Sequence, residues 1–131
     1  RKNTRRRQLF SVLNTVLHNK GWLADKVEYF ETRALAFDLA NRKLIYIDRY
    51  GVEDFQIIDL ENFSDCFLVQ KELMVKLILM SDGGAEQITI PFYIKYMDSP
   101  MRKRRLVKSA NEWKEIISTQ LELHQHSQYA E

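Results

Sequence analysis

The spacing of apolar residues predicts a helix at the start of the chain. From about Thr4 to Lys20, apolar side chains recur every three or four residues, as they do on one face of an α-helix. The stripe consists of Leu9, Val12, Leu13, Val16 and Leu17. Gly21 follows, and glycine readily adopts the left-handed conformation that often ends a helix. We therefore expect this helix to end at Lys20.

From Val27 to Phe92 the pattern changes to short runs in which apolar and polar residues alternate, which is typical of antiparallel strands. In "RALAFDLANRKLIYIDR" two such runs flank a turn at residues 40–42, and this arrangement predicts a hairpin. Alternate residues of its second strand face opposite sides of the sheet: Leu44 and Tyr46 on one side, Ile45 and Ile47 on the other.

The remaining strands are also separated by turn residues. "DFQIIDLENFSDCFLVQKE" contains two short strands with a bend near residues 62–65. "LMVKLILM" and "AEQITIPF" are joined through Asp82-Gly83, a strong hairpin signal because glycine accepts the positive φ of tight turns. With a first strand at "KVEYFE", we expect six or seven antiparallel strands.

The last element is predicted to be an amphipathic helix. Ser109 and Glu112 have the spacing of a capping box, which predicts that the helix begins there. The residues that then share one helical face are Trp113, Ile116, Ile117, Gln120, Leu121 and His124.

This order of elements predicts an α+β fold. We expect an N-terminal helix, six or seven antiparallel strands forming a curved sheet or partly open barrel, and a C-terminal amphipathic helix that closes it. The 131 residues are enough for one ordinary domain. We therefore predict a basic stub and helix over residues 1–21, followed by a single globular unit over residues 22–131.

The strand series from Arg33 to Pro91 and the terminal "SANEWKEII" resemble a bacterial pleckstrin-homology-like (PH-like) domain. The resemblance implies a seven-stranded barrel plugged at one end by the helix, with Trp113, Ile116 and Ile117 packed beneath it. It does not explain the N-terminal helix.

The same resemblance implies a phosphoinositide site among basic residues of the first strands. The nearest equivalents are Arg42, Lys43 and Arg49, but Asp48 stands beside Arg49 and the other turn residues are not basic. The sequence therefore departs from the lipid-binding pattern of the family. Many PH-like domains instead bind peptides or serve as assembly modules.

The charge of the chain is strongly divided. Ten of the twenty basic residues form two clusters, and the other ten stand against eighteen acidic residues, which leaves the rest of the chain at −8. We call these the first basic cluster (Arg1, Lys2, Arg5, Arg6 and Arg7) and the second basic cluster (Arg102, Lys103, Arg104, Arg105 and Lys108). An acidic body argues against a general nucleic-acid binder, whose folded part is normally basic as well.

The sequence contains no convergent catalytic set. His124 and His126 are two residues apart on a helix and point to different sides, and His18 has no partner at ligand spacing. The single cysteine, Cys66, is expected to be a small buried side chain on a strand. We therefore expect no enzymatic activity, no metal site, no cofactor and no small-molecule substrate.

Aromatic side chains precede the second basic cluster. We expect Tyr93, Tyr96 and Met97 in "PFYIKYMDSPMRKRR" to lie in a loop, where they could contact a membrane interface or a peptide. The alternative interpretation is a loop packed on the edge of the sheet.

Three functions compete for the basic clusters. The first is a membrane-associated protein whose cytoplasmic domain begins at "RKNTRRR", after a membrane segment that preceded Arg1. Anionic lipid attracts juxtamembrane arginine and lysine by about 1 kcal/mol per residue. The second is a soluble module that binds a peptide or an acidic protein, and the third, least favoured, is nucleic-acid binding. We predict a non-catalytic binding or scaffolding module at the inner, cytoplasmic face of a membrane.

Overall fold

A computed structural model describes residues 2–49 and 55–129, with side chains described for residues 6–49 and 55–125. The elements of the first half are α1 (Lys2–Lys20), β1 (Lys26–Phe30), β2 (Arg33–Asp38), β3 (Lys43–Asp48) and β4 (Gln56–Asp59). Those of the second half are β5 (Asp65–Gln70), β6 (Met74–Met80), β7 (Gln87–Ile94) and α2 (Lys103–Tyr129), with short 3-10 helices at Leu60–Asn62, Asp82–Gly84 and Pro100–Arg102. The predicted α+β fold is confirmed.

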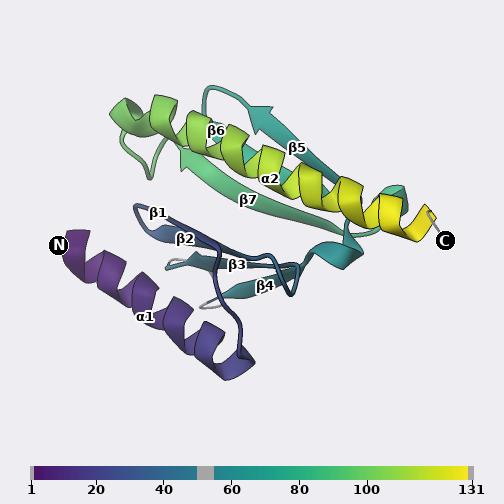
Figure 1. Ribbon diagram of the computed structural model, residues 1–131. Helices are drawn as coiled ribbons and strands as arrows, with labels where there is room; N and C mark the ends of the chain where they lie inside the picture. Colours follow the sequence, from purple (N-terminus) through teal and green to yellow (C-terminus); the bar gives the residue numbers. More distant parts are fainter. Residues whose placement is uncertain (1, 50–54, 130–131) are drawn as a thin grey trace. The chain divides into compact units, whose positions relative to one another are not determined.

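The chain divides into two compact units, which we call the N-terminal unit (residues 1–60) and the C-terminal unit (residues 61–131). Each unit contains one antiparallel sheet and one long helix. The sheets have the orders β1-β2-β3-β4 and β5-β6-β7, so the strands are not closed into a barrel (Figure 1). The domain boundary at residues 21 and 22, and the single unit over 22–131, stay predictions.

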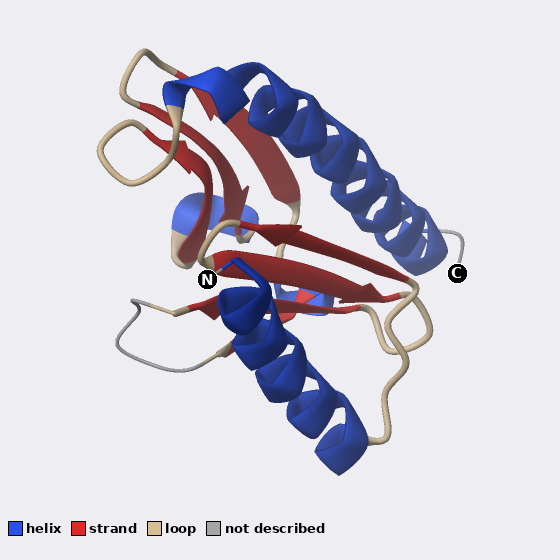
Figure 2. Ribbon diagram, turned by 90° about the vertical axis from the view of Figure 1, so that its left-hand side faces the viewer, coloured by secondary structure: helices blue, strands red, loops and turns tan. Residues whose placement is uncertain are grey.

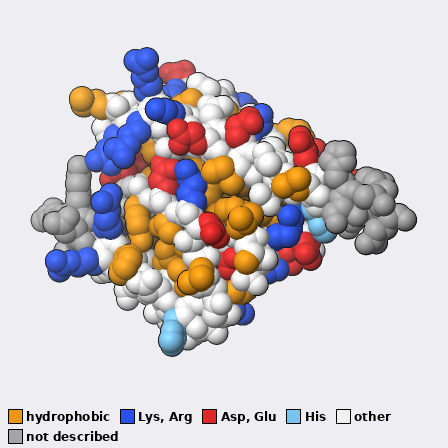
Figure 3. All heavy atoms as spheres, viewed as in Figure 1, with side chains coloured by type: hydrophobic (Ala, Val, Ile, Leu, Met, Phe, Trp, Pro, Cys, Tyr) orange, Lys and Arg blue, Asp and Glu red, His pale blue; other side chains and the backbone are white. Residues whose placement is uncertain are grey.

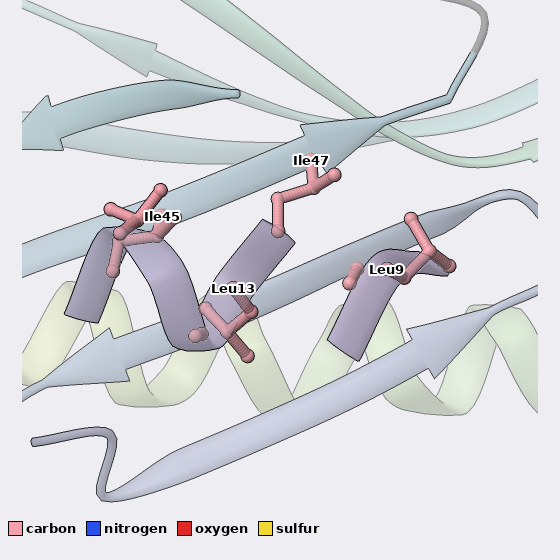
Figure 4. Packing of buried hydrophobic residues seen from close by; sticks show 7 residues of the cluster. Leu9, Leu13, Ile45 and Ile47 are labelled. Carbon is pink, nitrogen blue, oxygen red and sulfur yellow. The ribbon is translucent and has the colours of Figure 1, made fainter. Parts of the chain in front are cut away.

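In the N-terminal unit, α1 packs on one face of the four-stranded sheet. The pairing of β2 with β3 places Ala34 opposite Ile47 and Ala36 opposite Ile45, so small and branched side chains share this face. Leu9 and Leu13 of α1 are buried against it (Figure 4). Removing this apolar surface from water stabilises the unit by about 25 cal/mol per Å².

The predicted alternation along β3 is confirmed. Ile45 and Ile47 belong to the cluster that includes α1, whereas Leu44 and Tyr46 lie on the opposite side of the strand and are also buried. All six residues of β2 are buried.

The turns of the N-terminal unit follow the predicted chemistry. Gly21 has φ of 69°, and the amide of Trp22 donates a hydrogen bond of 2.9 Å to the carbonyl of Leu17, which caps α1 as predicted. Between β2 and β3, the carboxylate of Asp38 accepts a hydrogen bond of 3.0 Å from the amide of Asn41.

In the C-terminal unit, α2 lies along the three-stranded sheet (Figure 2). Alternate residues of β6 are buried, and the buried stripe of α2 recurs every three or four residues. This stripe consists of Leu106, Ala110, Trp113, Ile117 and Leu121. Of the three residues predicted to pack beneath this helix, Trp113 and Ile117 are fully buried, whereas Ile116 is only partly buried.

The predicted start of this helix is wrong. The helix begins at Lys103, and Ser109, the expected cap, is buried in its second turn. The apolar stripe extends upstream to Leu106, and packing of such a stripe contributes more to a helix than a local cap does. Arginine and lysine are also good helix formers, so the second basic cluster is helical.

Candidate functional site

The second basic cluster occupies the beginning of α2. Arg102 ends the preceding 3-10 helix, and Lys103 to Lys108 form the first turns of α2. Arg104, Arg105 and Lys108 are exposed. The first turn of α2 contains no acidic residue, so its positive side chains oppose the helix dipole. An anionic partner at this position would relieve that repulsion.

A short turn that is held by hydrogen bonds leads from β7 to α2. The amides of Met97 and Asp98 donate hydrogen bonds of 3.0 and 2.8 Å to the carbonyl of Ile94. The buried carboxylate of Asp98 in turn accepts a hydrogen bond of 2.7 Å from the amide of Ile94. These bonds fix the shape of the turn and direct its other side chains outward.

Three segments of the C-terminal unit meet at this end of the sheet. The amide of Lys95 donates a hydrogen bond of 2.9 Å to the carbonyl of Leu73 in the β5–β6 turn. The Nζ atom of Lys103 donates one of 3.2 Å to the carbonyl of Glu72, and it lies 5.6 Å from the centroid of the Tyr93 ring. The β5–β6 turn, the end of β7 and the start of α2 therefore lie side by side (Figure 1) and share one end of the unit's surface.

Apolar side chains are exposed on this surface. Met101 is 93% exposed and Tyr96 is 85% exposed, and about half of Leu73 and of Met97 is exposed. We call these four residues the apolar tip. Figure 3 shows Lys and Arg side chains gathered around a hydrophobic one at the start of α2. Isolated apolar side chains are common on protein surfaces, but a group of them flanked by basic residues is typical of an interaction site.

The structure confirms part of the predicted loop placement and corrects the rest. Tyr96 and Met97 are in the turn after β7, as expected. Tyr93 is instead a residue of β7 and is only 2% exposed. In β7, opposite Val75 and Lys76 of β6, a β-bulge inserts an extra residue. The bulge breaks the alternation of the strand, so the adjacent Phe92 and Tyr93 are both buried.

The first basic cluster is described only in part. Arg1 lies outside the described residues, as do the side chains of Lys2 and Arg5 within α1. Arg6 and Arg7 are exposed, and together with Phe10 and Tyr29 they line a shallow hollow of about 360 Å³ in the N-terminal unit. Phe10 is 54% exposed.

Arg6 and Tyr29 influence each other electrostatically. The guanidinium carbon of Arg6 lies 5.7 Å from the centroid of the Tyr29 ring, which is cation–π distance. Partial burial raises the pKa of the Tyr29 hydroxyl, and the charge of Arg6 partly opposes that rise. Arg6 is therefore held against the protein more closely than an extended surface arginine.

Arg42, Lys43 and Arg49, the basic residues considered above for a phosphoinositide site, do not converge. Arg42 and Lys43 stand at the beginning of β3, and Arg49 follows its end, which separates them by roughly 20 Å at about 3.3 Å per residue. Lys43 also pairs with Asp59 at 2.9 Å. One headgroup cannot contact all three side chains.

No group of three or more His, Cys, Asp or Glu side chains suited to a metal ion occurs among the described residues. Cys66 is buried on β5, and desolvation raises the pKa of its thiol to about 12, with Lys114 partly opposing the shift. A thiol with this pKa is protonated at neutral pH and is a poor nucleophile.

Sequence reasoning missed Leu73 and Met101 of the apolar tip, and Lys71 and Lys95 beside it. Met101 precedes the second basic cluster directly, so its position was a usable signal. Leu73 carried no such signal, because an apolar residue at the start of a strand is normally buried.

Comparison with known protein families, with characterised proteins and with solved structures finds no match to this chain. Within the residues that the structure describes, no helix is long and apolar enough to cross a membrane.

Proposed function

We propose that this protein is a non-catalytic, PH-like binding module that attaches to an anionic membrane surface, at its cytoplasmic face. The observation that carries the proposal is the exposure of Arg104, Arg105 and Lys108 of the second basic cluster, on the first turns of α2, beside the exposed apolar tip. Four strands, then three strands, then a helix with a buried Trp113 support the PH-like assignment.

Charge supports a lipid surface as the partner. Within residues 71–73 and 95–108 there are seven basic residues and two acidic ones, although the chain outside the two basic clusters has a net charge of −8. Anionic lipid attracts each basic side chain near the surface by about 1 kcal/mol. Several such residues on one surface are enough for reversible attachment, while the acidic remainder of the chain is repelled.

Vesicle co-sedimentation tests this proposal. The full chain is mixed with phosphatidylcholine vesicles that contain or lack phosphatidylserine, at low and at physiological salt. We expect binding only when phosphatidylserine is present, and weaker binding at the higher salt because exposed charges are screened. Equal binding to both vesicles, or no binding to either, would overturn the proposal.

The same experiment separates the competing functions. Duplex DNA and an acidic polypeptide are offered to the protein at physiological salt, each in competition with phosphatidylserine vesicles. We expect neither polyanion to displace the protein from the vesicles at equal charge concentration. Displacement by DNA would instead favour nucleic-acid binding, and displacement by the acidic polypeptide would favour a soluble protein-interaction module.

A further inference from the structure

We infer that the apolar tip inserts into the headgroup region of an anionic membrane, so that the C-terminal unit docks by the end where α2 begins. The inference rests on the proposed function and adds to it: it assigns the inserting side chains and separates insertion from attraction by charge. Tyr96 and Met101 are the principal inserting residues.

Exposure is the first argument. Among the described large apolar side chains, Met101 and Tyr96 have the two highest exposed fractions, 93% and 85%. Tyr96 lies in the turn after β7, and Met101 lies in the 3-10 helix Pro100–Arg102 that leads into α2, so both are near the end of the sheet where α2 begins. Apolar surface that projects in this way is stabilised when a lipid interface removes it from water.

The rigidity of the supporting backbone is the second argument. Asp98 forms two hydrogen bonds with Ile94 across the turn: its amide donates to the carbonyl of Ile94, and its carboxylate accepts from the amide of Ile94. The amide of Arg102 donates a further hydrogen bond of 3.0 Å to the carbonyl of Ser99. Pro100 limits the backbone further at the start of the 3-10 helix. Little backbone conformational entropy is therefore lost when Tyr96 and Met101 enter the interface.

Residue chemistry is the third argument, and it favours lipid over an acidic protein. Tyrosine is enriched at membrane interfaces, where its ring lies at the depth of the headgroups and its hydroxyl stays hydrated. The surrounding charges suit lipid phosphates: Lys71 is exposed on the β5–β6 turn, and Arg104, Arg105 and Lys108 are exposed at the start of α2. Glu72, an exposed acid in this region, pairs with Lys95 at 3.6 Å.

Two serine substitutions test insertion without changing charge. The double variant Tyr96→Ser/Met101→Ser is compared with the wild type and with the matched control Phe67→Ser/Leu123→Ser, whose side chains are about half exposed elsewhere on the unit. We expect the affinity of the tip variant for phosphatidylserine vesicles to fall at least tenfold, because the apolar transfer is lost. We expect the control to stay within about twofold of wild type.

A tryptophan reporter measures how deeply position 96 of the folded protein enters the membrane. The variant Tyr96→Trp is mixed with phosphatidylserine vesicles that carry brominated acyl chains, and Leu123→Trp serves as the control. Trp22 and Trp113 contribute to every spectrum, so the wild-type signal is subtracted. We then expect a blue shift and quenching of the fluorescence at position 96 and no change at position 123. Both substitutions replace exposed side chains, so the unfolding curves of these two variants should match the wild type.

The outcomes separate the two proposals. If the wild type does not bind phosphatidylserine vesicles, both the proposed function and the insertion fail. If the wild type binds, but the tip variant binds equally well and position 96 is not quenched, insertion is refuted while attachment by charge stands. Loss of binding in the tip variant together with quenching at position 96 establishes insertion.

Discussion

The two basic clusters begin similar helices but have different surroundings. Neither α1 nor α2 has an acidic residue in its first turn, so the basic side chains at the start of each helix oppose its dipole. Beside Arg6 and Arg7 the apolar neighbours are Phe10 and the partly buried Tyr29. The cluster on α2 instead adjoins four exposed apolar side chains, three of them on hydrogen-bonded turns and Met101 on the 3-10 helix that precedes α2.

This difference shows that a run of positive charge does not by itself identify a contact surface. Both clusters would be assigned equally from the sequence. What distinguishes them is how many exposed apolar side chains adjoin the charges: beside the described part of the first basic cluster there is Phe10, whereas four adjoin the second. We therefore expect the α2 cluster to contribute most of the membrane affinity.

The largest expected effect comes from the packing that holds α2 in place. Trp113 is fully buried against the three-stranded sheet, and Trp113→Ala should lower the free energy of unfolding by about 3–5 kcal/mol. Urea denaturation followed by circular dichroism measures the change. The exposed Leu123→Ala is the control and should change stability by less than about 0.5 kcal/mol. A loss below about 1 kcal/mol for Trp113→Ala would contradict the packing of α2.

The corresponding change in the other unit should be similar in kind and somewhat smaller. Leu13 is buried between α1 and the four-stranded sheet, and Leu13→Ala should cost about 2–5 kcal/mol of unfolding free energy. The same denaturation experiment measures it, with the exposed Leu23→Ala as control. If Leu13→Ala were as mild as its control, α1 would not be part of the folded unit.

Cys66 gives a pH-dependent probe of the C-terminal unit. Because burial raises its pKa from 9.0 to about 12, the native state keeps the thiol proton while the unfolded state loses it. This contribution to stability is fully present below pH 9 and is lost between pH 9 and about 12, by at most about 1.4 kcal/mol per pH unit.

Denaturation of the wild type and Cys66→Ala across this pH range measures the thiol contribution as a difference in slope. The subtraction removes the titration of lysine and tyrosine, which both proteins share. Native Cys66 should also react slowly with a thiol reagent at pH 8, since its thiolate is scarce. Equal slopes in the two proteins, or rapid labelling, would show that the thiol is not buried as described.

The smallest effect is expected at the start of α2, and it should have opposite signs for folding and for binding. Arg104→Glu places an acid near the positive end of the helix dipole, which should stabilise the protein by about 0.3–1 kcal/mol. The same change should weaken attachment to phosphatidylserine vesicles. For this one variant, denaturation measures the change in stability and co-sedimentation measures the change in affinity for vesicles. A variant that is less stable than the wild type would indicate that Arg104 has a structural role.

The fold could be predicted largely from periodicity and turn residues. The stripe that ends at Gly21, the faces of β3 and the hairpin at Asp82-Gly83 are all local signals, and all three are present. The start of α2 was mispredicted because Ser109 carries a local signal that the packing of Leu106 overrides. Long-range packing of this kind is not encoded in any short stretch of sequence.

The candidate site could be predicted only in part. The second basic cluster, Tyr96 and Met97 were available from composition and order. Leu73 lies beside them because a backbone hydrogen bond connects the β5–β6 turn to the turn after β7, whereas Tyr93 is buried because of the bulge in β7. Exposure depends on which backbone segments meet, and that is a property of the folded sheet rather than of the residue type.

The comparison between the two clusters is tested most directly by paired charge reversals. Arg104→Glu/Arg105→Glu, Arg6→Glu/Arg7→Glu and the control Lys20→Glu/Arg49→Glu change net charge equally at exposed positions. Their affinities for phosphatidylserine vesicles are measured at one salt concentration. We predict that the α2 pair loses at least tenfold in affinity, clearly more than the α1 pair, and that the control changes least. Equal losses in the three variants would contradict the assignment of the contact surface to the start of α2.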